Sequence, residues 1–392
     1  MKSHRIESID ILRGIVMVIM ALDHVRTYFH YGNMYAHPTD LETTTPAIFF
    51  TRWITHFCAP VFVFLAGTSA FLSSTRKESK TEVAKFLLTR GLWLIFLELT
   101  VINFAWTFDP SFSITIFQVI WAIGISMVIL SVLIFLPKNF LAAVGILLVV
   151  GHNLLDDFTL SGSGLVDIIW YVFHQQNILV TDNNHVMFLY YPAMPWAGLM
   201  ILGYLFGALY HNDYSAEKRR KWLLQIGLIS TLLFVVIRLQ NVYGDPSAWG
   251  EQENSLFTFM SFLNTTKYPP SLLFILMTIG PSIIVLLLLE NIKNLLTDML
   301  VIIGRVPLFF YVVHIYLIHL LTMIAINFTG RSWTDWIWNA EAFLESSTID
   351  YGFSLWVVYL VWAVVMVVLF PVCKKYHLYK GANKDKWWLS YL

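Results

Sequence analysis

Three ionisable residues on one apolar segment near the start of the chain have the types and spacing to do chemistry together. Asp10 and Arg13 precede a run of apolar residues, and His24 follows that run. On an α-helix, Arg13 and His24 fall within about 20° of each other and about 16 Å apart along the axis. Asp10 lies about 60° from Arg13 and about 40° from His24, so all three share one face.

Each of these side chains suits a step in group transfer. Arg13 is a planar, permanently charged donor suited to phosphate, and Asp10 could hold it in place. His24 can act as a general base or as a transient acyl carrier near neutral pH. The spacing therefore fits a long donor molecule with a phosphorylated head and a reactive far end. The simpler alternative makes Arg13 an interfacial topology anchor and His24 a hydrogen-bonded residue at a helix end.

Other histidines also lie in apolar segments. His56 precedes Pro60 by four residues, at a depth that would let it share a pocket with His24. A capping or interfacial role is the alternative for His56. His314 and His319 are five positions apart and point about 140° away from each other on a helix, which argues against a metal pair. The twelve histidines show no zinc spacing, so we predict no metal site.

The composition sets the environment in which these residues work. Hydrophobic residues make up 57% of the 392 residues, and charged residues only 13%, about half the share in a soluble protein. The net charge is zero, which gives no balance suited to nucleic acid. The two cysteines, Cys58 and Cys373, are far apart in apolar stretches, which excludes a disulfide scaffold and a cysteine-based zinc site. We therefore predict an all-α polytopic membrane protein.

The apolar segments long enough to cross a bilayer define the predicted topology. A membrane helix needs roughly 20 mainly apolar residues. We predict one transmembrane domain over residues 1–392 with about ten spans. The predicted spans are residues 9–29, 47–72, 86–106, 114–135, 140–155, 190–210, 222–239, 270–289, 301–326 and 353–372.

The positive charges predict the orientation. If the N-terminus is cytoplasmic, nineteen of the 25 Lys and Arg residues fall on the inner side, five fall outside and Arg13 lies within the first span. The five outer residues are Arg26, Arg52, Arg238, Lys267 and Arg331. This asymmetry favours cytoplasmic N- and C-termini by the positive-inside rule. His24 then lies towards the outer side.

The loops and the placement of polar residues separate two classes of function. The outer loops, residues 30–46, 156–189, 240–269 and 327–352, are long enough to form a lid or a vestibule for a polar substrate. A transporter or flippase with a buried Arg/His path is one hypothesis. Transporters often contain broken helices in symmetry-related halves, but this chain shows no convincing internal repeat and concentrates its polar residues in the first two spans. An enzyme is the favoured hypothesis.

Several blocks of the sequence also resemble a known family. Residues 8–14 followed by His24 resemble the opening of the membrane-bound acyltransferases, in which Arg, ten residues and then His mark the active helix. Residues 49–69, 191–196 with 203–207, 304–314 and 386–392 resemble blocks of the heparan-alpha-glucosaminide N-acetyltransferase-like family, especially its bacterial members. The resemblance covers most of the chain, and its first two blocks are specific in combination.

The resemblance implies a function and a location. It implies transfer of an acetyl group from cytoplasmic acetyl-CoA, across the membrane, to an amine or hydroxyl of an extracytoplasmic sugar or glycan. The chain would then be a multi-pass protein of the bacterial inner (plasma) membrane, in contact with lipid and independent of nucleic acid and metal ions, with a homodimer as a possible state. An O-acyltransferase that uses another acyl-CoA is the alternative within this class.

The resemblance also ranks the site residues, with departures from the family pattern. The eukaryotic enzymes carry Asn at the His24 position and a catalytic His in the loop just after that helix. The same distance here ends near Tyr35, with His37 the nearest histidine. At the His56 position those enzymes carry Asp. We therefore expect His24 first, then His56 and His37, as catalytic residues.

The acyl donor is expected to bind at the opposite end of the first span. Arg13 and Asp10 stand there, and Arg305 stands at the inner end of the ninth span. We expect Arg13 and Arg305 to bind the phosphates of CoA, and Asp10 to complete this cofactor-binding set by holding Arg13 in place. A plain topology anchor is the alternative role for Arg305.

Overall fold

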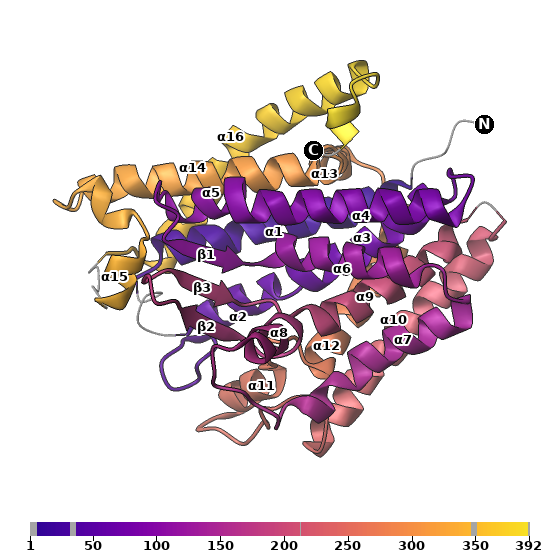
Figure 1. Cartoon of the computed structure of the whole chain (residues 1–392), viewed down its shortest axis with the longest axis horizontal. Coiled ribbons are helices and arrows are strands. Elements are labelled where there is room, and N and C mark those ends of the chain that lie inside the picture. The colour runs from indigo at the N-terminus through magenta and orange to yellow at the C-terminus, as the bar shows by residue number, and fades with distance from the viewer. Residues whose placement is uncertain (1–5, 32–36, 212, 346–350, 391–392) are drawn as a thin grey trace.

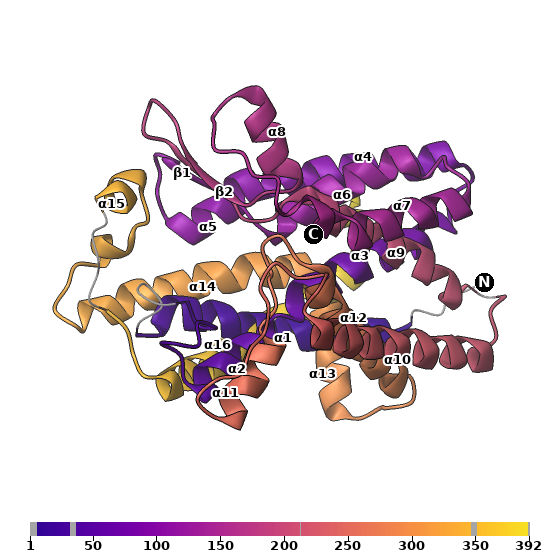
Figure 2. The same ribbon diagram turned by 90° about the horizontal axis from the view of Figure 1, so that it is seen from below.

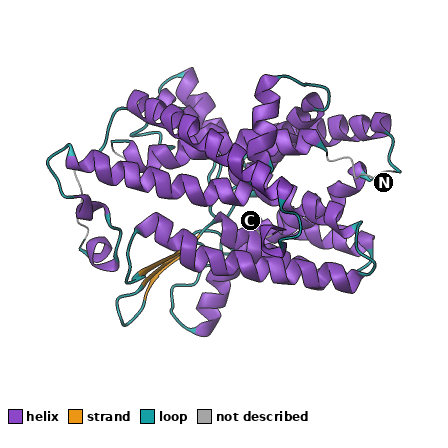
Figure 3. Cartoon of the chain, turned by 90° about the horizontal axis from the view of Figure 1, so that it is seen from above, coloured by secondary structure: helices purple, strands orange, loops and turns teal. Residues whose placement is uncertain are grey.

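The computed structural model describes residues 6–31, 37–211, 213–345 and 351–390. Most of these residues are helical, with one small sheet near one end of the molecule (Figure 3). The main helices are α1 (Glu7–Phe29), α2 (Pro46–Thr55), α3 (Cys58–Ser74), α4 (Lys80–Leu97), α5 (Asn103–Thr107), α6 (Val119–Leu133), α7 (Lys138–Val150), α9 (Ala193–Phe206), α10 (Ala216–Gln240), α12 (Leu272–Leu289), α13 (Leu295–Gly304), α14 (Pro307–Asn327) and α16 (Leu355–Ala382).

Short elements connect the main helices at the two ends of the bundle. The short α-helices are α8 (Leu165–Phe173), α11 (Ser255–Leu263) and α15 (Ala340–Leu344). A π-helical turn, η1 (Glu98–Ile102), continues α4 into α5. The 3₁₀ turns are η2 (His152–Leu155), η3 (Gly207–Tyr210), η4 (Trp333–Trp336) and η5 (Trp387–Ser390). The strands are β1 (Ile114–Phe117), β2 (Asn177–Val180) and β3 (Val186–Leu189).

Seven helical segments in the described part of the chain are long and apolar enough to cross a membrane. They are Pro46–Ser74, Lys80–Thr107, Ala193–Tyr210, Ala216–Gln240, Leu272–Leu289, Pro307–Asn327 and Leu355–Ala382. Two further predicted spans contain shorter apolar helices, α6 and α7. The all-α polytopic membrane architecture predicted from the composition is therefore confirmed. Helices α10 and α16 expose many large apolar side chains, as helices facing lipid do.

Helix α1 runs through the middle of the bundle (Figures 1 and 2) and packs against α3, α12, α13, α14 and α16. Its five charged residues are too many for a lipid-facing span: Glu7, Asp10, Arg13, Asp23 and Arg26. Most of the helix is buried, so these charges meet protein groups instead of lipid. At 23 residues it is about 34 Å long, enough to cross the hydrocarbon core.

The ends of α1 and α16 show that these two helices run in opposite directions. The amide of Phe353, just before α16, donates to the carbonyl of Phe29 at the end of α1. Further from these ends, in the middle of α1, the indole of Trp362 donates to the carbonyl of Val18. The beginning of α1 and the end of α16 therefore lie on the same side of the bundle, as an even number of spans requires. Which side faces the cytoplasm stays a prediction from the charges.

The predicted span 114–135 is wrong at its beginning. Residues Ile114–Phe117 form β1, which pairs in parallel with β3, and β3 pairs in antiparallel with β2. The side chain of Asn103 fixes β1, because its amide donates to the carbonyl of Ile114 and its oxygen accepts from the amide of Ile116. The β-branched residues of this stretch suit an extended strand, and uniform apolarity hid it from the span prediction.

The predicted span 301–326 is also wrong, because it joins two helices. Helix α13 ends at Gly304 and α14 begins at Pro307. Proline disfavours helical backbone at the preceding residue, and Val306 is accordingly outside the α-region with φ −128° and ψ 46°. Proline is well suited to the first turn of the next helix, where an N–H would have no partner. Arg305 lies at this break, at the beginning of α14.

Candidate functional site

A cavity of about 520 Å³ lies at the C-terminal end of α1, the end predicted to face outwards, in the size range of small-molecule sites. Helices α1, α2 and α3 form one side of it, and β1, β3 and the loops around residues 190, 268 and 338 form the other. We call it the outer cavity. The polar and charged residues that line it are Asp23, His24, Arg26, Thr27, Arg52, Thr55, Gln118, Lys267, Asp335 and Asn339. His24, the first catalytic candidate, thus lies in a cavity that combines a largely apolar wall with several polar and charged groups.

His24 is paired with a second histidine across α1 and α14. Its Nδ1 lies 2.7 Å from Nε2 of His314, which is fully buried. Nδ1 of His314 lies 3.0 Å from the carbonyl oxygen of Phe310, which can only accept, so this nitrogen carries the proton. In the neutral pair, Nε2 of His314 then accepts from Nδ1–H of His24. This leaves the lone pair on Nε2 of His24, the nitrogen needed for a base or nucleophile.

The sequence contains a signal for this pair that our site prediction did not use. Arg305 precedes His314 by nine residues, much as Arg13 precedes His24 by eleven on α1. Helices α1 and α14 pack against each other, and Arg305 lies at the break just before α14, so each segment pairs a basic residue with a histidine further along the chain. His319, in contrast, lies within hydrogen-bonding distance of the carbonyl oxygens of Ala105 and Trp336, away from this pair.

A compact ion network lies beside His24 in the outer cavity. Asp23 pairs with Arg26 at 3.1 Å through one carboxylate oxygen and with Arg52 through the other. All three side chains are largely buried, so the carboxylate offsets the charge of two arginines that would be costly alone. Our site prediction did not include these residues, although charges within apolar segments are the expected signal. The network fixes the position of α1 against α2 beside the histidine pair.

Lys267 and Tyr268 add a titratable group to the wall of the outer cavity. The Lys267 ammonium lies 5.0 Å from the centre of the Tyr268 ring. Burial raises the pKa of the Tyr268 phenol, but the positive charges of Lys267 and Arg52 lower it more, and the resulting pKa is about 8. The site therefore contains a phenol that ionises close to physiological pH.

A second cavity of about 290 Å³ lies further along α1, towards its beginning. We call it the inner cavity. Its lining includes four basic residues and, among the residues that the structure describes, no carboxylate: Arg13, Arg90, Arg305 and Lys380. Two of the three predicted CoA-binding residues, Arg13 and Arg305, therefore line one cationic pocket. Such a pocket suits phosphate groups.

Asp10, the third of these residues, lies behind the pocket and joins the two arginines. One oxygen of its buried carboxylate lies 3.2 Å from Nη1 of Arg13, and the other lies 3.0 Å from Nε of Arg305. Arg13 also donates to the hydroxyl of Ser69 at 2.8 Å and to the carbonyl of Gly304 at 3.1 Å. The sequence-based suggestion that Asp10 holds Arg13 matches these contacts.

The inner and outer cavities share part of their walls. Phe62 and Val119 line both of them. Tyr311 lines the inner cavity, and its ring centre lies 6.1 Å from that of His24, which lines the outer one. The two cavities are therefore neighbours along α1 and share a wall at Phe62 and Val119, with the four basic residues in one and His24 in the other.

The remaining predicted catalytic residues lie beside the outer cavity but do not line it; Thr55 and Cys58, on either side of His56 in the sequence, are lining residues. His56 is buried in the turn between α2 and α3, with its ring centre 5.3 Å from that of Phe274. His37 is exposed, and its Nδ1 lies 3.0 Å from the hydroxyl of Thr39. Neither residue is among the described residues that line the two cavities. The structure thus brings together His24, Arg13, Asp10 and Arg305, but not these two histidines.

Comparison of the sequence with known protein families gives one match. The family model described as heparan-alpha-glucosaminide N-acetyltransferase, catalytic, matches residues 5–238. The matched region contains α1 to α4, α6, α7, α9 and most of α10, and so includes Asp10, Arg13 and His24. Arg305 and His314 lie beyond it. A search of individual curated proteins finds no match.

Proposed function

The chain belongs to the heparan-alpha-glucosaminide N-acetyltransferase family, and on that basis we propose that it transfers an acetyl group from acetyl-CoA to a sugar across the membrane. Family membership makes it an acyltransferase-like membrane enzyme. The donor, the acceptor and the direction of transfer are the content of the proposal. In a bacterial inner membrane, the donor would come from the cytoplasm and the acceptor from the outer side.

The junction between the inner and outer cavities is the observation that carries the proposal. A transmembrane transferase needs a cationic donor site at one side, a reactive group near the acceptor at the other, and a passage for the acyl arm between them. Arg13 and His24 are placed for the first two tasks about 16 Å apart along α1. Phe62 and Val119 mark the passage, because they line both cavities.

The inner cavity supports acetyl-CoA as the donor. Arg13 and Arg305 can donate to phosphate oxygens in the planar geometry that guanidinium groups favour, and Lys380 and Arg90 add positive charge. Asp10 limits the mutual repulsion of the two arginines and orients both. The flexible arm of the donor would then extend along α1, towards Phe62 and His24.

His24 supplies the chemistry that the transfer requires. In direct transfer, its Nε2 takes a proton from the acceptor amine or hydroxyl while that group attacks the thioester carbonyl. The C–S bond breaks, an amide or ester bond forms, and the thiolate leaves and is protonated. In a two-step route, Nε2 itself attacks the carbonyl and passes the acetyl group on. Both routes use the lone pair that the His314 hydrogen bond leaves on Nε2.

The lining of the outer cavity supports a sugar acceptor. Tyr190, Tyr268 and Trp338 present aromatic side chains, which suit the apolar faces of a sugar ring. Gln118 and Asn339 provide amide groups for hydroxyls. An O-acyltransferase with another acyl-CoA would use the same catalytic residue.

Label transfer tests the proposal directly. Purified protein is incubated with acetyl-CoA radiolabelled in the acetyl group, with and without glucosamine, and label on sugar and protein is measured. We expect acetylated sugar from the native chain and from His211→Ala, a control at an exposed histidine. His24→Ala should lower the rate by about 10²- to 10⁴-fold, the usual contribution of a positioned base.

Two outcomes would contradict the proposal. Normal turnover of a folded His24→Ala protein would remove this residue from the mechanism. Absence of transfer with any acyl-CoA, together with sugar flux in proteoliposomes, would favour the transporter alternative that the joined cavities also permit.

A further inference from the structure

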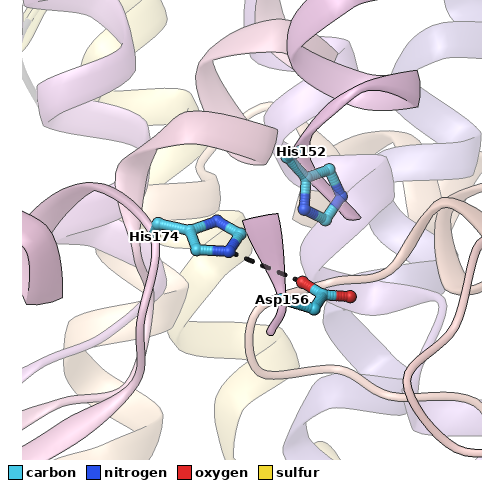
Figure 4. A group of neighbouring side chains, drawn as sticks. All are labelled: His152, Asp156 and His174. Atoms are coloured by element: carbon cyan, nitrogen blue, oxygen red, sulfur yellow. Dashed lines mark ion pairs between the residues drawn. The ribbon is translucent and has the colours of Figure 1, made fainter. Parts of the chain in front are cut away.

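Two histidines and an aspartate converge near the outer end of α7 (Figure 4). His152 lies in η2, Asp156 directly follows that turn, and His174 directly follows α8. One possible ligand atom from each residue lies within 4.8 Å of the other two. Nε2 of His174 lies 3.5 Å from a carboxylate oxygen of Asp156. The loop between η2 and α8 brings together residues that the sequence separates by 22 positions.

Burial makes this cluster unusual. His152 is 1% exposed and His174 is 2% exposed. Among the described residues, Nδ1 of His174 has no hydrogen-bond partner, and His152 has only the backbone of Pro270 close enough to interact with one of its two ring nitrogens. A buried polar atom without a partner costs about 1–3 kcal/mol, so two such nitrogens in one cluster need a physical explanation.

The carboxylate is oriented towards the two histidines by a second set of contacts. The side-chain NH₂ group of Asn153 donates to one oxygen of Asp156 at 2.7 Å. The side-chain oxygen of Asn153 accepts from the backbone N–H of Leu272 at 2.9 Å. The other Asp156 oxygen is the one that faces His174. Metal-binding carboxylates are commonly held in this way by outer contacts.

We propose that His152, Asp156 and His174 form a binding site for Zn²⁺. Imidazole nitrogen and carboxylate oxygen are ordinary zinc ligands, at about 2.0–2.2 Å from the ion. Tetrahedral coordination needs ligand atoms about 3.4 Å apart, so ligand atoms that now lie within 4.8 Å of one another would have to move closer together when the ion binds. Water would complete the coordination. A bound ion would take one nitrogen of each imidazole, and the other nitrogen of His152 could then donate to the backbone of Pro270.

The position of the cluster assigns a stabilising role to the ion. None of the three residues is among the described residues that line the inner or outer cavity. The ion would link η2, the end of α8 and, through Asn153, the beginning of α12. Strand β2 begins three residues after His174 and pairs with β3, whose Phe188 lines the outer cavity. This inference does not depend on the proposed acetyl transfer.

Zinc binding to the purified full chain tests the proposal. The protein in detergent is freed of metal with a chelator and titrated with Zn²⁺ against a chromophoric zinc indicator. We expect one equivalent to bind and to raise the melting temperature, because a ligand of the folded state stabilises it. His152→Ala and His174→Ala should lose this binding. His185→Ala is the matched control, because His185 lies in the same outer region but contacts Thr115 instead.

A conservative variant and a second metal keep the test informative if an alanine variant does not fold. Asp156→Asn keeps the size of the side chain but removes its charge, and should weaken zinc binding by roughly 10-fold or more. Co²⁺ in the native chain should give the intense visible bands of a four-coordinate site. The proposal is overturned if the native chain binds no stoichiometric Zn²⁺. It is equally overturned if folded His152→Ala or Asp156→Asn protein binds Zn²⁺ as tightly as the native chain.

Discussion

The hydrogen bond between His24 and His314 determines which nitrogen of His24 can react. A lone histidine on α1 could present either tautomer to the outer cavity, but the Phe310 carbonyl fixes the proton on Nδ1 of His314. Nε2 of His314 then fixes the proton on Nδ1 of His24. His314 is thus a positioning residue, and it acts through His24.

The effect of His314 can be separated from a general loss of structure. His314→Phe removes the acceptor and should lower the turnover number for acetyl transfer by about 10- to 100-fold, as loss of an orienting partner commonly does. The KM for acetyl-CoA should stay unchanged, because the donor phosphates bind at the other end of α1. His314→Gln keeps an acceptor oxygen and should recover most of the activity. Equal losses in both variants would contradict a positioning role.

Arg13 should contribute to donor affinity and not to the chemical step. Arg13→Gln removes the charge while keeping a polar side chain, so the Kd for CoA should rise about 10-fold, the loss expected for one charge-assisted hydrogen bond. Arg220→Gln is a suitable control, because Arg220 is another basic residue that pairs with Glu290 outside the inner cavity. Binding is measured by calorimetry with CoA itself. An unchanged Kd in Arg13→Gln would argue that Arg13 is only a topology anchor.

Tyr268 gives the outer cavity a measurable pH dependence. Its pKa is about 8 in the folded protein, below the usual value near 10 that applies in the unfolded chain. The folded protein therefore releases this proton at a lower pH than the unfolded chain does. The stabilising effect of its ionisation is complete above about pH 10 and is lost as the pH falls through 8. Absorbance at the phenolate band should show one tyrosine titrating near pH 8. Tyr268→Phe should remove this step, and Lys267→Met should move it to higher pH; an unmoved step would contradict the assignment.

At the scale of elements, two glycines allow α1 and α13 to cross with their backbones in contact. A Cβ atom on Gly304 would lie 1.9 Å from the carbonyl oxygen of Asp10, and one on Gly14 would lie 2.2 Å from that of Leu300. Such contacts with backbone atoms cannot be relieved by rotating a side chain. The close crossing also places Arg305 within reach of Asp10.

Substitution of Gly304 should therefore separate the two helices. Gly304→Ala should destabilise the protein by about 1–3 kcal/mol, the range for overpacking, and weaken CoA binding as Arg305 moves away from Asp10. Gly381→Ala, near the end of α16, has open space around its Cβ and serves as the control. Thermal unfolding in detergent measures the first effect. A melting temperature equal to that of the native chain would show that the crossing is not tight.

The sequence predicted elements well where periodicity and charge agree, and less well where irregular backbone matters. The shared face of Asp10, Arg13 and His24 follows from helix geometry, and the structure places them as expected. β1 was missed because an apolar strand of four residues carries no signal that distinguishes it from the start of a helix. The break at Arg305 was missed although Pro307 signals it. The pairing of His24 with His314 and of His152 with His174 depends on tertiary contacts that one sequence does not contain.

At the scale of the whole molecule, the proposed function would place the donor in the inner cavity and the acceptor in the outer one, at different points along α1. The cationic residues line one end of the path and His24 lines the other, and Phe62 and Val119 stand between them. A larger side chain at Phe62 should therefore obstruct the acyl arm without changing either end. This distinguishes transfer through the membrane domain from reaction of both substrates on one face.

Phe62→Trp in proteoliposomes tests this arrangement. With acetyl-CoA on the side of the inner cavity and glucosamine on the other, we expect the rate of sugar acetylation to fall by about 10-fold or more, because an added ring in a packed passage costs about 1–3 kcal/mol. The Kd for CoA should stay within about 2-fold, since the proposed phosphate contacts come from the basic residues of the inner cavity and not from Phe62. Phe140→Trp, on a side chain 66% exposed on α7, is the matched control. Undiminished transfer by Phe62→Trp would mean that the acetyl group takes another route, and a parallel loss of CoA binding would place Phe62 in the donor site instead of the passage.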